Sequence, residues 1–206
     1  MPYKNLNEYI NKLVDAVKSV DNNCLNTLSN QIESRLNGEG DIYLLGNGGS
    51  AANAHHIAGD YLKTFSLNGN RIKIDSLSDN ECYLTAAAND IDFSEIYEVL
   101  VNTRITKNDL MIFLSGSGNS MNLIKAARKA KKCGIKTAAL VGYKCGALND
   151  LVDIPLHFLI EDMEIAEDCQ ISTFHFIKQN LLFKNTSSDI SNSFKYEKRT
   201  NEDLIA

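Results

Sequence analysis

Prolines and long apolar runs are scarce in this chain of 206 residues. Its two prolines, Pro2 and Pro155, leave long stretches without a helix-breaking residue. No apolar run approaches the roughly 20 residues that a membrane-spanning helix needs, and the polar N-terminal stretch contains no apolar core of a signal peptide. We therefore expect a cytoplasmic protein with no membrane partner.

Acidic residues outnumber basic ones, 26 to 21, and the sequence contains no C-x-x-C pair. The five cysteines are odd in number and widely spaced, which is typical of reduced cytoplasmic thiols rather than of a disulfide framework. The formal net charge is −5, which argues against a nucleic-acid partner, because such proteins usually present a basic face. A small anionic ligand is still compatible with this charge, because backbone N–H groups bind phosphate without net positive charge.

Helical and strand-like patterns alternate along the rest of the chain. Residues 3–37 carry apolar side chains at helical spacing and predict two amphipathic helices, separated near Asp21–Asn23. Short apolar runs then follow at 41–46, 71–77, 110–115, 136–142 and 154–160. Helical stretches separate most of them or follow the last one, at 50–64, 92–104, 120–133 and 163–184. The alternation predicts an α/β fold with a five-stranded parallel sheet, flanked by helices and joined by right-handed crossovers.

We divide the chain into three segments on this basis. Residues 1–40 form N-terminal helices that pack on the sheet or in an oligomer interface. Residues 41–184 form the α/β domain. The polar stretch 185–206 lacks helical periodicity over most of its length and predicts a solvated tail, with an arm ordered by a partner as the alternative.

The first chemically distinctive loop is Gly46-Asn47-Gly48-Gly49-Ser50, which joins a predicted strand to a predicted helix. Glycines let the backbone approach a ligand closely, and a helix N-terminus offers free N–H groups and partial positive charge to an anion. The spacing matches neither the dinucleotide pattern G-x-G-x-x-G nor a Walker loop, so we expect no nucleotide cofactor. The alternative is a tight turn without a ligand.

The second loop, residues 115–120 with the sequence SGSGNS, also lies between a predicted strand and a helix. Its hydroxyl groups donate to phosphate oxygens without adding charge. Because the carboxyl ends of parallel strands line one crevice, where open α/β sheets bind ligands, we expect the two loops to form one anion-binding site.

The sequences GNGGSAANAHHIAGD and SGSGNS resemble the sugar isomerase (SIS) domain family, and within it the phosphoheptose isomerases, over about residues 3–184. The resemblance implies a flavodoxin-like SIS fold, a sugar-phosphate ligand, and sites between the subunits of a homotetramer. It assigns the phosphate grip to Ser115, Gly116, Ser117 and Ser120. It assigns substrate contacts to Asn47, Gly48, Gly49, Ser50, Asn89, Asp90 and Gln170.

The resemblance also implies a zinc site, with departures in this sequence. The family's histidine and glutamate, four residues apart on one helix, fall on His56 and Asp60, and its glutamine falls on Gln170. Its last histidine falls on Lys178, and a protonated lysine has no lone pair for zinc. His175 is the alternative ligand, although its direction on an ideal helix differs from that of Lys178 by about 60°.

Interconversion of a 2-ketose and an aldose moves a proton between C1 and C2 through an enediolate, which needs a base and a donor or cation for the oxyanion. We assign Asp60 as the base and His56 as a proton shuttle or metal ligand, with Lys178 as the cation if it points inward. The alternatives are a surface acid at Asp60 and a structural histidine at His56. A solvated Lys178 and a packed core histidine at His175 are favoured.

Other polar residues have simpler alternatives. Asp90 would cap a helix that begins near Asp92, and His157 in a strand would be structural. Glu167, in an acidic stretch that suits the start of a helix, would either complement the helix dipole or face the site.

Three functions stay open. The first is an isomerase that converts sedoheptulose 7-phosphate to a heptose 7-phosphate for bacterial lipopolysaccharide or capsule synthesis. The second is an isomerase of another sugar phosphate. The third is a non-catalytic sugar-phosphate-binding regulator.

Overall fold

The computed structural model describes residues 3–66 and 72–186, with side chains up to residue 184. Apart from its first two residues, the predicted tail at 185–206 lies outside the described residues, as does the first residue of the predicted strand at 71–77. Among the described residues, no helix is long and apolar enough to cross a membrane.

Five parallel strands form one sheet in the order β2-β1-β3-β4-β5. Their bounds are β1 Ile42–Leu45, β2 Ile74–Ser76, β3 Leu110–Ser115, β4 Lys136–Val141 and β5 Ile154–His157. The predicted five-stranded parallel sheet is confirmed, although β2 and β5 are shorter than the apolar runs that predicted them. The strand order reverses between β1 and β3, and in such sheets a ligand crevice opens at the carboxyl ends of the strands at that point.

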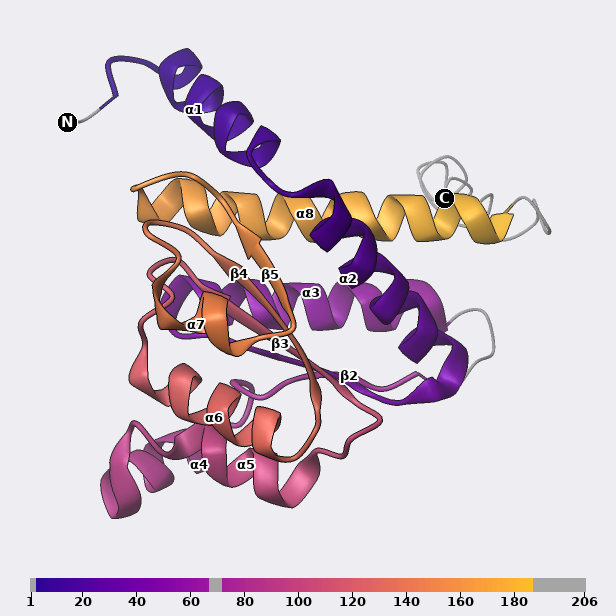
Figure 1. Ribbon diagram of the computed structural model, residues 1–206, viewed down its shortest axis with the longest axis vertical. Coiled ribbons are helices and arrows are strands. Elements are labelled where there is room, and N and C mark those ends of the chain that lie inside the picture. Colours follow the sequence, from indigo (N-terminus) through magenta and orange to yellow (C-terminus); the bar gives the residue numbers. More distant parts are fainter. Residues whose placement is uncertain (1–2, 67–71, 187–206) are drawn as a thin grey trace, which may run out of the picture.

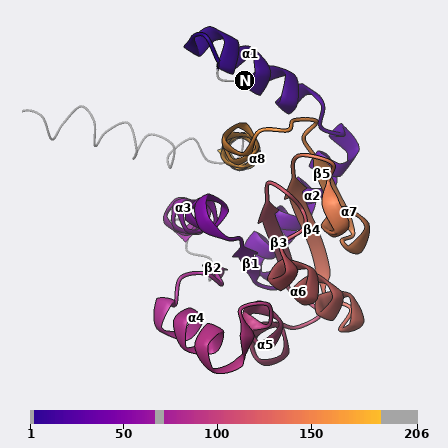
Figure 2. The same cartoon turned by 90° about the vertical axis from the view of Figure 1, so that its left-hand side faces the viewer.

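Strand side chains alternate between two apolar layers, because successive residues of a strand point to opposite faces. In β1, Ile42 and Leu44 belong to one layer, and Tyr43 and Leu45 to the other. Helices cover both faces (Figures 1 and 2). The first face is covered by α1 Leu6–Lys18, α2 Asn22–Ser34, α3 Gly48–Ser66 and α8 Met163–Thr186. The second face is covered by α4 Glu81–Ala87, α5 Ile96–Arg104, α6 Met121–Lys132 and α7 Gly146–Leu151.

The N-terminal helices confirm the predicted break between them. The side chain of Asp21 accepts a hydrogen bond of 2.7 Å from Asn23 N and caps α2. Helix α2 packs against β5 and is followed by the π-helical turn η1, Arg35–Glu39. Helix α1 packs along α8 with Ala16 as its one buried residue, and in Figure 1 it projects beyond α8, away from the sheet.

The region between β2 and α5 differs from the prediction. The stretch predicted as one helix from 92 onward begins at Ile96, and α4 and the π-helical turn η2, Ala88–Asp92, precede it. Asp90 therefore lies within η2, and the prediction that it caps a helix at this point is wrong. The cause is local: Asp92 Oδ1 accepts from Ser94 N at 2.7 Å, and this side-chain turn separates η2 from α5.

Candidate functional site

The GNGGS loop follows the end of β1. Hydrogen bonds attach its first residue to α5 and to the segment after β2. Gly46 O accepts hydrogen bonds from Tyr97 Oη at 2.7 Å and from Ser78 Oγ at 3.2 Å. Helix α3 begins at Gly48, two residues earlier than predicted, with a φ of 54° that favours glycine. The loop therefore presents the N-terminus of α3 at the carboxyl edge of β1, as an anion-binding turn requires.

The SGSGNS loop leaves the end of β3, the neighbour of β1. Ser115 Oγ accepts from Gly118 N at 3.1 Å, and Ser117 Oγ accepts from Asn119 N at 3.2 Å. Gly118 has a φ of 66° and lies so close to the backbone of Cys145 that a side chain would collide there. Ser120 precedes α6 without a side-chain capping bond, so its hydroxyl does not occupy the first amides of α6. Its predicted contact with phosphate stays a prediction.

Two asparagine side chains join these loops. Asn47 Nδ2 donates to Asn122 Oδ1 at 2.9 Å, and Asn122 Nδ2 donates to Asn47 Oδ1 at 2.8 Å. Sequence reasoning missed Asn122. Its signal was an amide on the apolar face of a predicted helix, four residues before the buried Ala126.

Ser50 and Gln170 lie together between α3 and α8. Both are buried, at 3% and 0% exposure, and Gln170 Nε2 donates to Ser50 Oγ at 3.3 Å. Gln170 Oε1 accepts from Asn53 Nδ2 at 3.0 Å. These contacts tie α3 to α8, and the predicted contacts of Ser50 and Gln170 with substrate stay predictions.

The carboxylate of Glu167 lies against Gly49, where any side chain would collide with it. Burial raises the pKa of this carboxyl, and hydrogen bonds from the backbone and hydroxyl of Ser50 partly offset the rise. Glu167 thus faces the GNGGS loop, which is one of the two alternatives that the sequence left open.

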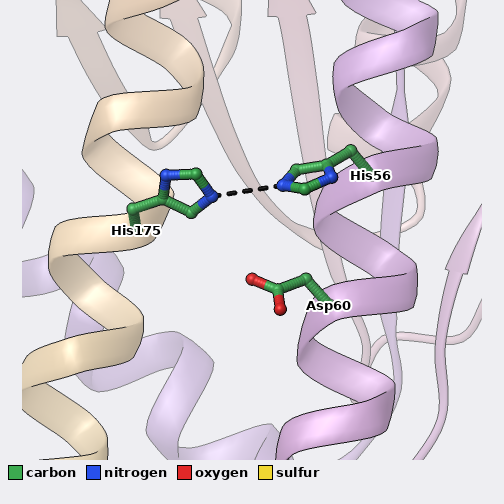
Figure 3. Close-up of side chains that lie close together, drawn as sticks. All are labelled: His56, Asp60 and His175. Carbon is green, nitrogen blue, oxygen red and sulfur yellow. Dashed lines mark hydrogen bonds between the residues drawn. The ribbon is translucent and has the colours of Figure 1, made fainter. Parts of the chain in front are cut away.

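The predicted catalytic residues His56 and Asp60 lie where α3 and α8 run side by side. Figure 2 shows α8 end-on. His56 Nε2 and His175 Nε2 are 3.1 Å apart (Figure 3), and Asp60 Oδ2 accepts an ion-paired hydrogen bond from Lys178. The prediction of a packed core histidine at 175 is wrong, because His175 is exposed. The prediction of a solvated Lys178 is also wrong, because its side chain is only 14% exposed.

Both differences have one physical cause. The contacts 56–175 and 60–178 advance together along both helices, so α3 and α8 run parallel. Residues three or four apart on one helix face neighbour each other. His175 therefore meets His56, and Lys178 meets Asp60, despite the offset of about 60° between His175 and Lys178 on their helix.

A cation fits part of this cluster. One ligand atom from each of His56, Asp60 and His175 lies within 4.8 Å of the other two. Two imidazoles and a carboxylate are a donor set that catalytic zinc sites use, with a fourth position left for substrate or water. Gln170 makes buried hydrogen bonds with Ser50 and Asn53, and its predicted role as a metal ligand stays a prediction. His175 is the third member of the group that the structure brings together.

The remaining predicted residues lie outside the cluster of His56, Asp60, His175 and Lys178. Asn89 and Asp90 are exposed in η2, and Asn89 Nδ2 donates to Asp90 Oδ1 at 2.7 Å. His157 lies in β5 and its Nε2 is 2.8 Å from Tyr143 O, which agrees with a structural role.

Comparison with known proteins agrees with this geometry. The SIS domain model matches residues 6–142. A phosphoheptose isomerase of Helicobacter pylori (strain Shi470) is 36% identical over 142 residues, which cover 69% of this chain and 74% of the relative. Another phosphoheptose isomerase, from Chlorobaculum parvum, is 33% identical over 174 residues, which cover 82% of each chain.

The fold has the same relatives. The structure of a phosphoheptose isomerase from Francisella tularensis superposes with a TM-score of 0.76 at 22% identity, over 85% of this chain and 95% of that one. The strand order and these matches lead to one conclusion: the chain belongs to the SIS domain family, among relatives named phosphoheptose isomerases.

Proposed function

We propose that the protein is an aldose–ketose isomerase that converts sedoheptulose 7-phosphate to a heptose 7-phosphate, a step that supplies heptose for bacterial surface polysaccharides. The observation that carries the proposal is the meeting of two helix N-termini at the ends of the adjacent strands β1 and β3. The names of the relatives supply the substrate.

The phosphate would bind at the SGSGNS loop. Ser117, Ser120 and the first amides of α6 donate to its oxygens there, and the dipole of α6 favours the negative charge. Asn47, Gly48 and Gly49 would meet the sugar from the neighbouring loop, and Asn89 and Asp90 remain proposed contacts.

Asp60 would act as the base that moves a proton between C1 and C2 of the sugar. The ion pair with Lys178 holds the Asp60 carboxylate in a fixed position between α3 and α8, which a positioned base requires. Lys178, held in the same groove, would stabilise the developing oxyanion as a fixed cation. His56 and His175, whose ring nitrogens face each other, would pass protons between the sugar oxygens and solvent.

Zinc binding is the alternative role of this cluster, in which His56, Asp60 and His175 would hold the ion instead of transferring protons. When bound, the ion would polarise the sugar carbonyl as a Lewis acid.

A homo-oligomer, with a tetramer as the expected size, and a cytoplasmic location complete the proposal. The homo-oligomer is supported by an exposed apolar stripe on α1, formed by Leu6, Ile10, Val14 and Val17. The cytoplasmic location is supported by five free cysteines.

The test is turnover of sedoheptulose 7-phosphate by purified protein, with and without a chelator and added zinc, beside the isosteric variant Asp60→Asn. We expect wild-type turnover and a fall in kcat of about 10²- to 10⁴-fold in the variant, the usual contribution of a general base. Asp79→Asn, in the exposed loop after β2, is the control for removal of one carboxylate.

Lack of turnover under every metal condition would contradict the proposal. If the sugar phosphate still raised the melting temperature in that case, a binding role or another substrate would replace it.

A further inference from the structure

The hydrogen-bonded amides of Asn47 and Asn122 connect the two halves of the crevice. We propose that Asn122 is a positioning residue that fixes the spacing between the GNGGS and SGSGNS loops, and through it the placement of a ligand held by both. The identity of that ligand rests on the proposed function, whereas the bridge itself is a feature of the fold.

The orientation of the Asn122 amide is determined by three contacts. It exchanges two hydrogen bonds with Asn47, at 2.9 and 2.8 Å, and its Oδ1 also accepts from Leu123 N at 2.9 Å. A flipped amide would place donor against donor and acceptor against acceptor. With 1% exposure, Asn122 does not reach the crevice surface, so it acts on a ligand through Asn47.

Besides the first turns of α8, which lie against Gly49 and Gly116, the hydrogen bonds of the two loops lead to different elements. Gly46 O is held by Tyr97 and Ser78 beneath β1. On the second loop, Gly116 O accepts from Gly142 N at 2.9 Å and Gly118 O accepts from Leu148 N at 3.1 Å, which attaches it to the end of β4 and to α7. Beyond the pairing of β1 with β3, the asparagine pair is a direct side-chain link between the N-terminal ends of α3 and α6.

The consequence for a sugar phosphate is specific. Its phosphate requires only the second loop, whereas its reacting carbons must also lie correctly against the first loop and α3. A misplacement of about 1 Å can cost about 10²-fold in rate. Loss of the Asn47–Asn122 bridge should therefore reduce turnover and leave the affinity for inorganic phosphate unchanged.

The experiment uses the neutral variant Asn122→Leu, which removes both hydrogen bonds to Asn47 and the one from Leu123 N at similar side-chain volume. Binding of inorganic phosphate is measured by calorimetry, and kcat and KM are measured with sedoheptulose 7-phosphate. We expect a phosphate Kd within about threefold of wild type and a kcat lower by about 10- to 100-fold.

Two controls separate positioning from general damage. Asn102→Leu makes the same substitution on the exposed face of α5 and should change neither quantity. Val101→Ala opens a cavity in the apolar layer beneath α6 and should lower stability without the loss of kcat. An unchanged kcat in Asn122→Leu, or an equal loss of phosphate binding, would overturn the inference.

Failure of the proposed function would be visible separately, as absence of turnover in the wild-type protein. The bridge is then judged by urea unfolding of Asn47→Leu, Asn122→Leu and the double variant. Coupled losses of stability support it, and strictly additive losses overturn it.

Discussion

Among single residues, Asp60 lies next to both a cationic side chain and two imidazole rings. Lys178 pairs with one of its oxygens, and the imidazoles of His56 and His175 lie within metal-binding reach of the carboxylate. The ammonium group of Lys178 would repel a divalent cation that approaches the same carboxylate, whereas it would attract an oxyanion that develops on the substrate. Lys178 should therefore have opposite effects on zinc affinity and on turnover.

Replacement of Lys178 by methionine tests both effects. Lys178→Met removes the charge at similar length, so zinc affinity, measured by competition with a chromophoric chelator, should rise by at least about tenfold. Loss of an oxyanion-stabilising cation should lower kcat by about 10²-fold.

Lys184→Met on the same helix, where Lys184 pairs with Glu33 at 3.2 Å on the surface, provides the matched control. Zinc affinity that falls or stays constant in Lys178→Met would show that the ammonium group does not compete with the metal.

At the level of helices and strands, the parallel packing of α3 against α8 brings His56 to His175 and Asp60 to Lys178. Small residues on α3 allow close approach, and Ala54 and Ala58 are buried between larger side chains. Tyr61 connects α3 to α8 near the His56–His175 contact. Its buried Oη donates to Phe174 O, next to His175, at 2.7 Å. The register of the two helices therefore depends partly on one hydroxyl.

Removal of that hydroxyl should affect both stability and activity. In Tyr61→Phe we expect the free energy of unfolding in urea to fall by about 1 kcal/mol, the net value of one hydrogen bond. We also expect a several-fold lower kcat, because His175 and Lys178 lose their fixed position.

Tyr83→Phe is the matched control, since Tyr83 Oη donates to Ile96 O at 2.8 Å between α4 and α5. Equal effects of the two variants on kcat would remove any special role of the α3–α8 register.

At the scale of the whole molecule, α1 leaves an apolar stripe uncovered. Leu6 is 71% exposed, and Ile10, Val14 and Val17 continue the stripe along one side of the helix. Only Ala16 of this helix is buried, and polar bonds such as Tyr9 Oη to Asp168 at 2.6 Å attach it to α8. A second copy of the chain is the proposed cover of this stripe.

Charges placed on the stripe should dissociate that assembly. We expect the double variant Ile10→Glu/Val14→Glu to sediment as a monomer, and wild type as an oligomer, because burial of two carboxylates in an apolar interface is strongly unfavourable.

Asn11→Glu, which adds a charge to an exposed polar position of the same helix, should remain oligomeric. A wild-type monomer at micromolar concentration would contradict the proposed oligomer.

The sequence by itself determined the features that depend on neighbours along the chain. Alternating apolar runs and helical periods predicted the parallel sheet, and Asp21 predicted the break between α1 and α2, because helices and turns close their hydrogen bonds within a few residues. The GNGGS and SGSGNS loops were recognisable for the same reason. The short segments α4, η2 and α7 escaped prediction, since pieces of five to seven residues show little periodicity.

Only the tertiary structure decided which side chains face one another. Asn47 meets Asn122 across 75 positions, His56 meets His175 across 119, and Asp60 meets Lys178 across 118. Each contact depends on the rotation and axial shift of one helix relative to another, and these are set by the packing of the apolar layers beneath. Local sequence patterns contain neither quantity, which is why His175 was expected in the core and Asn122 was not noticed.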